Sequence, residues 1–193
     1  MTARLRIPAL WCVLALATGS VLAAQQPPER KGFWIAFGFG YGSATSSCDS
    51  CTAGGREGAL SGFLKMGGTP SPRLLLGGET NGWVRNDSGS TVTRGNASFA
   101  AYYYPVATSS FFLKGGVGYS VYRAQTSFVN WSGSGFGLLA GAGYDVRVGR
   151  NISLTPVINF FAGLLGSVDA PGYVGSGGYS QNIVQVALGI TFH

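Results

Sequence analysis

Large apolar residues alternate with small residues along most of the chain after residue 31. In the first such segment, Gly32 to Gly42, glycines, Ala36 and Trp34 occupy one set of alternate positions. The large residues at the intervening positions are Phe33, Ile35, Phe37, Phe39 and Tyr41. Successive side chains of a β-strand point to opposite faces, so this spacing predicts a strand with one bulky face and one small face.

The same alternation recurs in segments separated by turn residues. It predicts strands at 32–42, 56–66, 73–85, 91–104, 110–123, 134–148, 151–165 and 181–193. Polar residues share the small face, as Asp145 and Arg147 do in the sixth segment and Asn159 in the seventh. A small polar face that lines a lumen and a bulky face that meets lipid are typical of membrane barrels. The pattern therefore predicts an all-β fold, an antiparallel up-and-down transmembrane β-barrel of about eight strands over residues 32–193.

The connectors predict which end of this barrel faces the cell. Membrane barrels have short turns on the periplasmic side and longer loops outside. The connectors expected on the periplasmic side are Gly67–Pro72, Pro105–Ser109 and Gly149–Arg150. The alternate connectors are Ser43–Gly55, Asn86–Ser90, Ala124–Gly133 and Gly166–Ser180, and three of these four are longer. A soluble barrel, whose apolar face points inward, has no reason to gather its long loops at one end.

Composition agrees with export to a membrane. The chain is 46% hydrophobic and only 10% charged, yet no run of about 20 apolar residues follows the first two dozen positions. Residues 1–24 carry Arg4 and Arg6, then the apolar stretch Ile7–Leu16, then small residues up to Ala24. This layout predicts a cleaved signal peptide at 1–24, with a membrane anchor helix as the alternative, and leaves 25–31 as a short N-terminal segment.

Neither the charges nor the cysteines indicate a cofactor. The net charge of +6 is diffuse, with no Lys/Arg cluster that would suggest nucleic acid. Cys48 and Cys51 lie in a polar stretch of an exported chain, which predicts a disulfide that closes a loop tip. Haem attachment would need histidine where Thr52 stands, and a zinc site would need more ligands. We therefore expect no metal and no cofactor.

The end of the chain resembles the terminal signal by which outer-membrane barrels are recognised for assembly. Its four marked positions are occupied by Gln185, Ala187, Ile190 and Phe192, with Ala187 where glycine is usual and His193 trailing the aromatic residue. With its size and strand number, the chain resembles the small eight-stranded barrels of the OmpA transmembrane domain and OmpX type. This resemblance implies the bacterial outer membrane as location, and its lipid, lipopolysaccharide and the barrel assembly machinery as partners.

Six charged residues are predicted to face the lumen: Lys65, Glu79, Arg94, Lys114, Asp145 and Arg147. Buried charges without partners are costly, so we expect these groups to pair. Two interpretations follow. In the first, the charges fill a barrel too narrow to conduct; in the second, Glu79 and its basic neighbours gate a narrow pore for ions or small polar solutes.

These features favour a non-enzymatic outer-membrane barrel that contributes to envelope structure or surface contact through its extracellular loops, with loop ligands unspecified. The gated pore is the alternative. A lipid-modifying enzyme is disfavoured, because lipid A deacylases and palmitoyltransferases of similar size pair a histidine with serine or aspartate. The single histidine, His193, is predicted at the periplasmic edge, whereas those enzymes act on the outer leaflet.

Overall fold

The structure, a computed structural model, describes residues 30–49, 55–87, 89–172 and 178–193. The predicted signal peptide at 1–24 and Cys51 lie outside the described residues. The eight long strands are β1 (Gly32–Ser47), β2 (Glu57–Ser71), β3 (Leu74–Asp87), β4 (Ser90–Tyr103), β5 (Phe111–Gln125), β6 (Asn130–Tyr144), β8 (Ile152–Gly166) and β10 (Tyr179–Phe192). Two short strands lie at the ends of the barrel: β7 (Val146–Arg147) pairs with β8, and β9 (Val168–Asp169) pairs with β6. Within the described ranges, no helix is long and apolar enough to cross a membrane.

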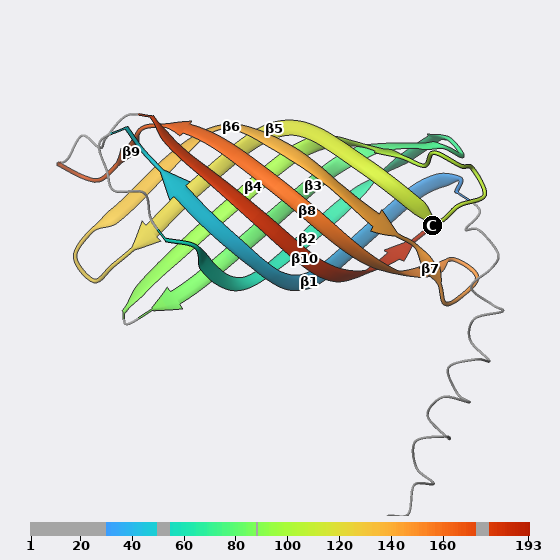
Figure 1. Cartoon of the computed structure of the whole chain (residues 1–193), viewed down its shortest axis with the longest axis horizontal. Helices are drawn as coiled ribbons and strands as arrows, with labels where there is room; N and C mark the ends of the chain where they lie inside the picture. The colour runs from blue at the N-terminus through green and yellow to red at the C-terminus, as the bar shows by residue number, and fades with distance from the viewer. Residues whose placement is uncertain (1–29, 50–54, 88, 173–177) are drawn as a thin grey trace, which may run out of the picture.

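The long strands form one closed antiparallel barrel. Each pairs with its neighbours in chain order, β6 pairs with β8, and β10 returns to β1 with Phe39 opposite Leu188. Figure 1 shows the tilted strands, with the C-terminus and β7 at one end and β9 at the other. We call these the C-terminal end and the β9 end. The predicted fold class is confirmed.

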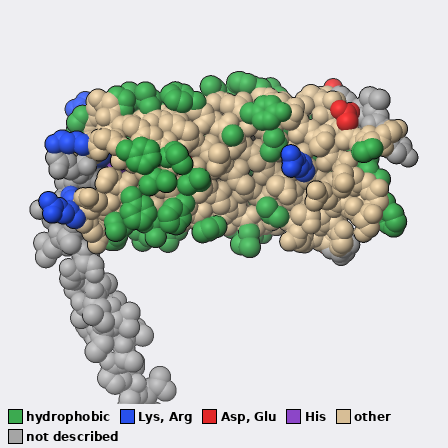
Figure 2. All heavy atoms as spheres, turned by 180° about the vertical axis from the view of Figure 1, so that it is seen from behind, with side chains coloured by type: hydrophobic (Ala, Val, Ile, Leu, Met, Phe, Trp, Pro, Cys, Tyr) green, Lys and Arg blue, Asp and Glu red, His purple; other side chains and the backbone are tan. Residues whose placement is uncertain are grey.

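The predicted alternation sets which face of each strand is buried. Along β10, inward residues from Gln181 to Thr191 are buried and the residues between them are exposed. The outer wall carries many exposed large apolar side chains, including Phe39, Leu60, Phe99, Val117, Leu138, Ile158, Phe160, Val186 and Leu188. Figure 2 shows such side chains spread over the wall, with Lys and Arg gathered at its left end, the C-terminal end. An apolar outer wall over a polar interior is what a lipid-facing barrel requires.

Several strands extend farther than the apolar pattern predicts. β1 continues to Ser47 because Thr45 and Ser46 still pair with β10, although they carry no apolar alternation. The predicted turn at 67–72 shrinks to residues 72–73, and the predicted loop at 124–133 shrinks to 126–129. The connector at 105–109 instead widens to 104–110. The contrast in connector length between the two ends is therefore weaker than predicted.

Glycine permits the close approach of strands in this narrow barrel. A Cβ atom added to Gly118 on β5 would lie 2.5 Å from Ser98 Cα on β4, which is closer than side-chain atoms come. The outward-facing Gly82 on β3 has nothing within 4 Å of its would-be Cβ. At Gly118, unlike at Gly82, the lack of a side chain is therefore needed for the close approach of the neighbouring strand.

Candidate functional site

A buried ion pair lies in the lumen near its middle. Lys114 on β5 donates to both carboxylate oxygens of Glu79 on β3, at 2.5 and 2.7 Å. The hydroxyl of Tyr102 on β4 donates to the same carboxylate at 2.6 Å. Glu79 is only 1% exposed and Lys114 6% exposed. Two of the six predicted lumen charges are therefore brought together, and Tyr102, which no sequence pattern indicates, completes the group.

Lys65 on β2 is held by aromatic rings. It is the cross-strand partner of Glu79, but the Lys114 ammonium forms the ion pair with that carboxylate. The Lys65 Nζ lies 4.9 Å from the Phe112 ring centroid, 5.0 Å from Tyr102 and 5.6 Å from Phe63. Cation–π attraction of this kind is stronger away from water. The ion pair and these rings together fill the central lumen, and we call them the central layer.

The C-terminal end of the lumen is crossed by Arg30, which precedes β1. Its guanidinium donates to the carbonyl oxygens of Ala107 at 3.1 Å and Ser109 at 2.5 Å, in the β4–β5 connector. It also lies 3.5 Å from the centroid of the Tyr104 ring. In an eight-stranded barrel β5 lies opposite β1, so Arg30 reaches across the opening. Nothing in the apolar pattern could mark it, because it lies outside the alternating segments.

Asp145 accepts two hydrogen bonds beside this crossing. Tyr104 donates to one carboxylate oxygen and Thr155 to the other, both at 2.8 Å, and the Thr155 and Thr191 hydroxyls are 2.8 Å apart. Burial, with the Asp145 carboxylate as second cause, raises the pKa of Tyr104 well above its ordinary value. Tyr104 therefore stays a neutral donor, which suits a fixed structural contact.

Arg147 lies at the rim of the C-terminal end, opposite the inward-facing Ser153 of β8, and its part in the lumen network stays a prediction. The sixth strand ends at Tyr144, and Arg147 lies on the short β7. Its side chain donates to the carbonyl oxygens of Gly149 at 3.1 Å and Arg150 at 2.5 Å, within the turn at the C-terminal end. Asp145, between the two strands, is buried, and Val146 and Arg147 pair with β8.

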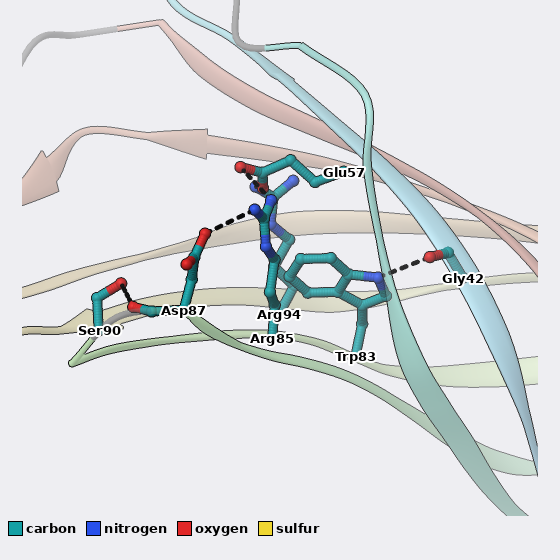
Figure 3. Close-up of polar contacts among 7 residues, drawn as sticks. All are labelled: Gly42, Glu57, Trp83, Arg85, Asp87, Ser90 and Arg94. Atoms are coloured by element: carbon teal, nitrogen blue, oxygen red, sulfur yellow. Dashed lines mark hydrogen bonds and ion pairs between the residues drawn. The ribbon is translucent and has the colours of Figure 1, made fainter.

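A second charged cluster lies at the β9 end. Glu57 on β2 bridges two arginines, with Arg94 at 3.0 Å and Arg85 at 2.9 Å. Arg85 also pairs with Asp87 at 2.8 Å, and Arg94 lies 4.9 Å from the centroid of the Trp83 ring. Figure 3 shows both guanidinium groups meeting Glu57 above the indole, which donates to the Gly42 carbonyl at 2.9 Å. Arg94 is buried, whereas the Glu57 side chain is about one-third exposed at the mouth.

The remaining predicted residues are placed as follows. Gln185 and Ala187 of the predicted assembly signal point inward, and Ile190 and Phe192 lie on the outer wall. The Phe192 ring stacks on the Phe37 ring with their centroids 6.2 Å apart. Their role in assembly stays a prediction. Cys48 is disulfide-bonded. Its predicted partner Cys51 lies outside the described residues, so that pairing also stays a prediction.

The fold defines a class of protein. The chain has the fold of small eight-stranded outer-membrane barrels. Neither a protein-family model nor a curated protein sequence matches it.

Individual solved structures show this likeness. Neisserial surface protein A, from Neisseria, superposes with a TM-score of 0.54 at 17% identity, covering 83% of this chain and 96% of that one. Ail, the attachment invasion locus protein of Yersinia pestis, superposes with a TM-score of 0.58 at 12% identity, covering 84% of this chain and 99% of that one. A second Ail structure, in complex with the heparin analogue sucrose octasulfate, superposes with a TM-score of 0.55 at 11% identity. It covers 83% of this chain and 99% of that one. At such identities the likeness is one of fold.

Proposed function

We propose that this protein is a non-enzymatic barrel of the bacterial outer membrane with a closed lumen, acting in envelope structure or surface contact. The observation that carries the proposal is the central layer. Lys114 and Tyr102 both donate to the buried Glu79 carboxylate inside the lumen, and aromatic rings surround the adjacent Lys65. An eight-stranded barrel has an interior just wide enough for side chains, so such a layer leaves little room for a water path.

The orientation follows from the two ends. The C-terminal end carries the C-terminus and exposed Lys31, Arg73 and Arg150, and we assign it to the periplasm. The β9 end then faces outward. There the tip of the β5–β6 hairpin presents Phe128, which is 96% exposed. An aromatic side chain held free of its own protein is suited to contact with another surface. The similar barrels named above include one called a surface protein and one called an attachment protein, which supports this proposal.

We propose a non-enzymatic role because the sequence offers no histidine that could act as a general base at the outer end. The chain has one histidine, His193, and it follows β10 at the C-terminal end. A serine needs an adjacent base to act as a nucleophile, and the end that we assign to the outside has no histidine. Incubation with outer-leaflet glycolipid should therefore leave its acyl chains unchanged by mass spectrometry.

Conductance tests the closed lumen. The refolded protein, shown to be folded by its shift in electrophoretic mobility on boiling, is added to planar bilayers beside a Glu79→Gln variant. We expect no discrete steps from the wild type. Stable steps from the wild type that change with the substitution would contradict the proposal and support the gated pore.

Adhesion tests the surface contact. Cells that display the wild type should adhere to a host-cell layer more strongly than cells with Phe128→Ser at matched surface amounts. Arg73→Ala, at the opposite end of the barrel, is the control. Equal adhesion by wild type and Phe128→Ser would remove Phe128 from the proposal, and equal adhesion by cells without the protein would leave only the envelope role.

A further inference from the structure

A small cavity lies in the lumen between the central layer and the β9 mouth. Its volume is about 10 Å³, and its lining includes Ser61, Asn81, Trp83, Arg94, Asn96 and Gln181. This is room for about one water-sized occupant. Arg94 separates the cavity from Glu57, which it contacts through Nη2.

Several buried polar atoms around this cavity lack a hydrogen-bond partner within the described part of the chain. The donors are Nε and Nη1 of Arg94, Nδ2 of Asn81 and Nδ2 of Asn96. These three side chains are only 4, 7 and 5% exposed, so bulk water does not satisfy them. The unpaired acceptors near them are fewer, Oδ1 of Asn81 and Oε1 of Gln181. Unsatisfied buried donors are destabilising, and a surplus of them favours an occupant that accepts hydrogen bonds.

The charge balance of the lumen points the same way. The buried cations of the described residues are Arg30, Lys65, Arg94 and Lys114, and the buried anions are Glu79 and Asp145. At the mouth, Arg94 is paired with Glu57, whose side chain is partly exposed and therefore offsets the buried charge less than a buried carboxylate would. Uncompensated positive charge in a low-dielectric interior attracts a counter-ion.

We propose that this cavity binds one small inorganic anion such as chloride. Arg94 supplies the charge, and the side-chain amides of Asn81 and Asn96 supply further donors. A halide is larger than water, so its binding requires the side chains of Ser61 and Asn81, whose polar atoms have no partner among the described residues, to shift. Glu57 competes with the anion for Arg94. This inference goes beyond the closed-lumen function and does not depend on it.

The first test locates bromide in the wild-type protein. Crystals grown in sodium bromide should show an anomalous peak within hydrogen-bond distance of Arg94 and the two asparagines. Water density at that place without an anomalous peak would overturn the proposal.

The second test measures affinity in solution. Chloride or bromide should raise the unfolding temperature saturably at constant ionic strength, with gluconate as the balancing anion, because a ligand that binds only the folded state stabilises it. Arg94→Gln should bind at least about tenfold more weakly, the loss expected for a charge-assisted hydrogen bond. Glu57→Gln should bind more tightly because Arg94 is released. Arg123→Gln, an exposed cation on β5, is the matched control and should bind like the wild type.

These outcomes separate the alternatives. Equal stabilisation by chloride and gluconate, or equal chloride affinity in Glu57→Gln and the wild type, would contradict the proposal. If Arg94→Gln does not fold, the bromide peak in the wild type and the Glu57→Gln titration still decide it. Conductance plays no part in this test, so a failure of the closed-lumen function would appear separately.

Discussion

Replacing Glu79 with glutamine should destabilise the barrel by about 3–5 kcal/mol, the cost of removing one partner from a buried ion pair. Glu79 is 1% exposed, so water cannot replace it. Its loss leaves the Lys114 and Lys65 ammonium groups buried with no carboxylate in the central layer. Glutamine keeps an acceptor for the Tyr102 hydroxyl, so the effect reports the missing charge rather than a lost hydrogen bond.

The sign of a second substitution tests this reasoning. Lys114→Met should destabilise the wild type, because Glu79 loses its two contacts at 2.5 and 2.7 Å. In the Glu79→Gln background the same change should stabilise, by about 2 kcal/mol or more, because it removes an unpaired buried cation. Urea unfolding in lipid vesicles, followed by tryptophan fluorescence, measures each free energy. Arg73→Met, an exposed cation, is the control. Additive effects of the two substitutions would refute the role of the pair.

Three further predictions concern the ends and the wall. Arg30→Ala should lower the free energy of unfolding by about 2 kcal/mol through lost hydrogen bonds across the C-terminal opening, measured by urea unfolding. Gly118→Val should abolish the heat-dependent mobility shift, because its side chain would collide with β4, whereas Gly82→Val should retain it. Burial lowers the pKa of His193, so the unfolded chain binds its proton more readily. Stability should therefore fall as pH drops below about 6.5, and the urea midpoint of His193→Gln should fall less.

Side-chain facing could be predicted from the sequence because the strand period of two is a local property. The period of two alone puts Phe39 and Leu188 on the bulky outer faces of their segments, and the two meet in the β1–β10 pairing. Glu79 and Lys114 were placed inward by the same rule, and they form the central pair. The sequence of a single strand is therefore enough to predict which of its side chains point inward and which point outward.

Partners across the lumen could not be predicted in this way. Arg94 pairs with Glu57, which lies 37 residues away and two strands apart, so the contact depends on strand tilt and stagger. Glu57 begins β2 next to a polar connector and carries no apolar signal. Arg30 precedes the alternating region altogether. Strand ends were missed for a related reason, since backbone pairing continues at Ser47 where apolar alternation has stopped.

The strands of 14 to 16 residues are longer than a lipid bilayer requires. At a rise of about 3.3 Å per residue and a tilt of about 40°, they span roughly 35–40 Å, against an apolar band about 25 Å tall. About 10–15 Å of hydrogen-bonded wall, shared between the two ends, should therefore stand clear of the lipid. Phe128 is carried on this wall by a hairpin whose connector is only Thr126–Val129. A side chain held by a rigid, hydrogen-bonded hairpin loses little conformational entropy when it binds. Even a small interface can therefore retain most of its intrinsic binding free energy.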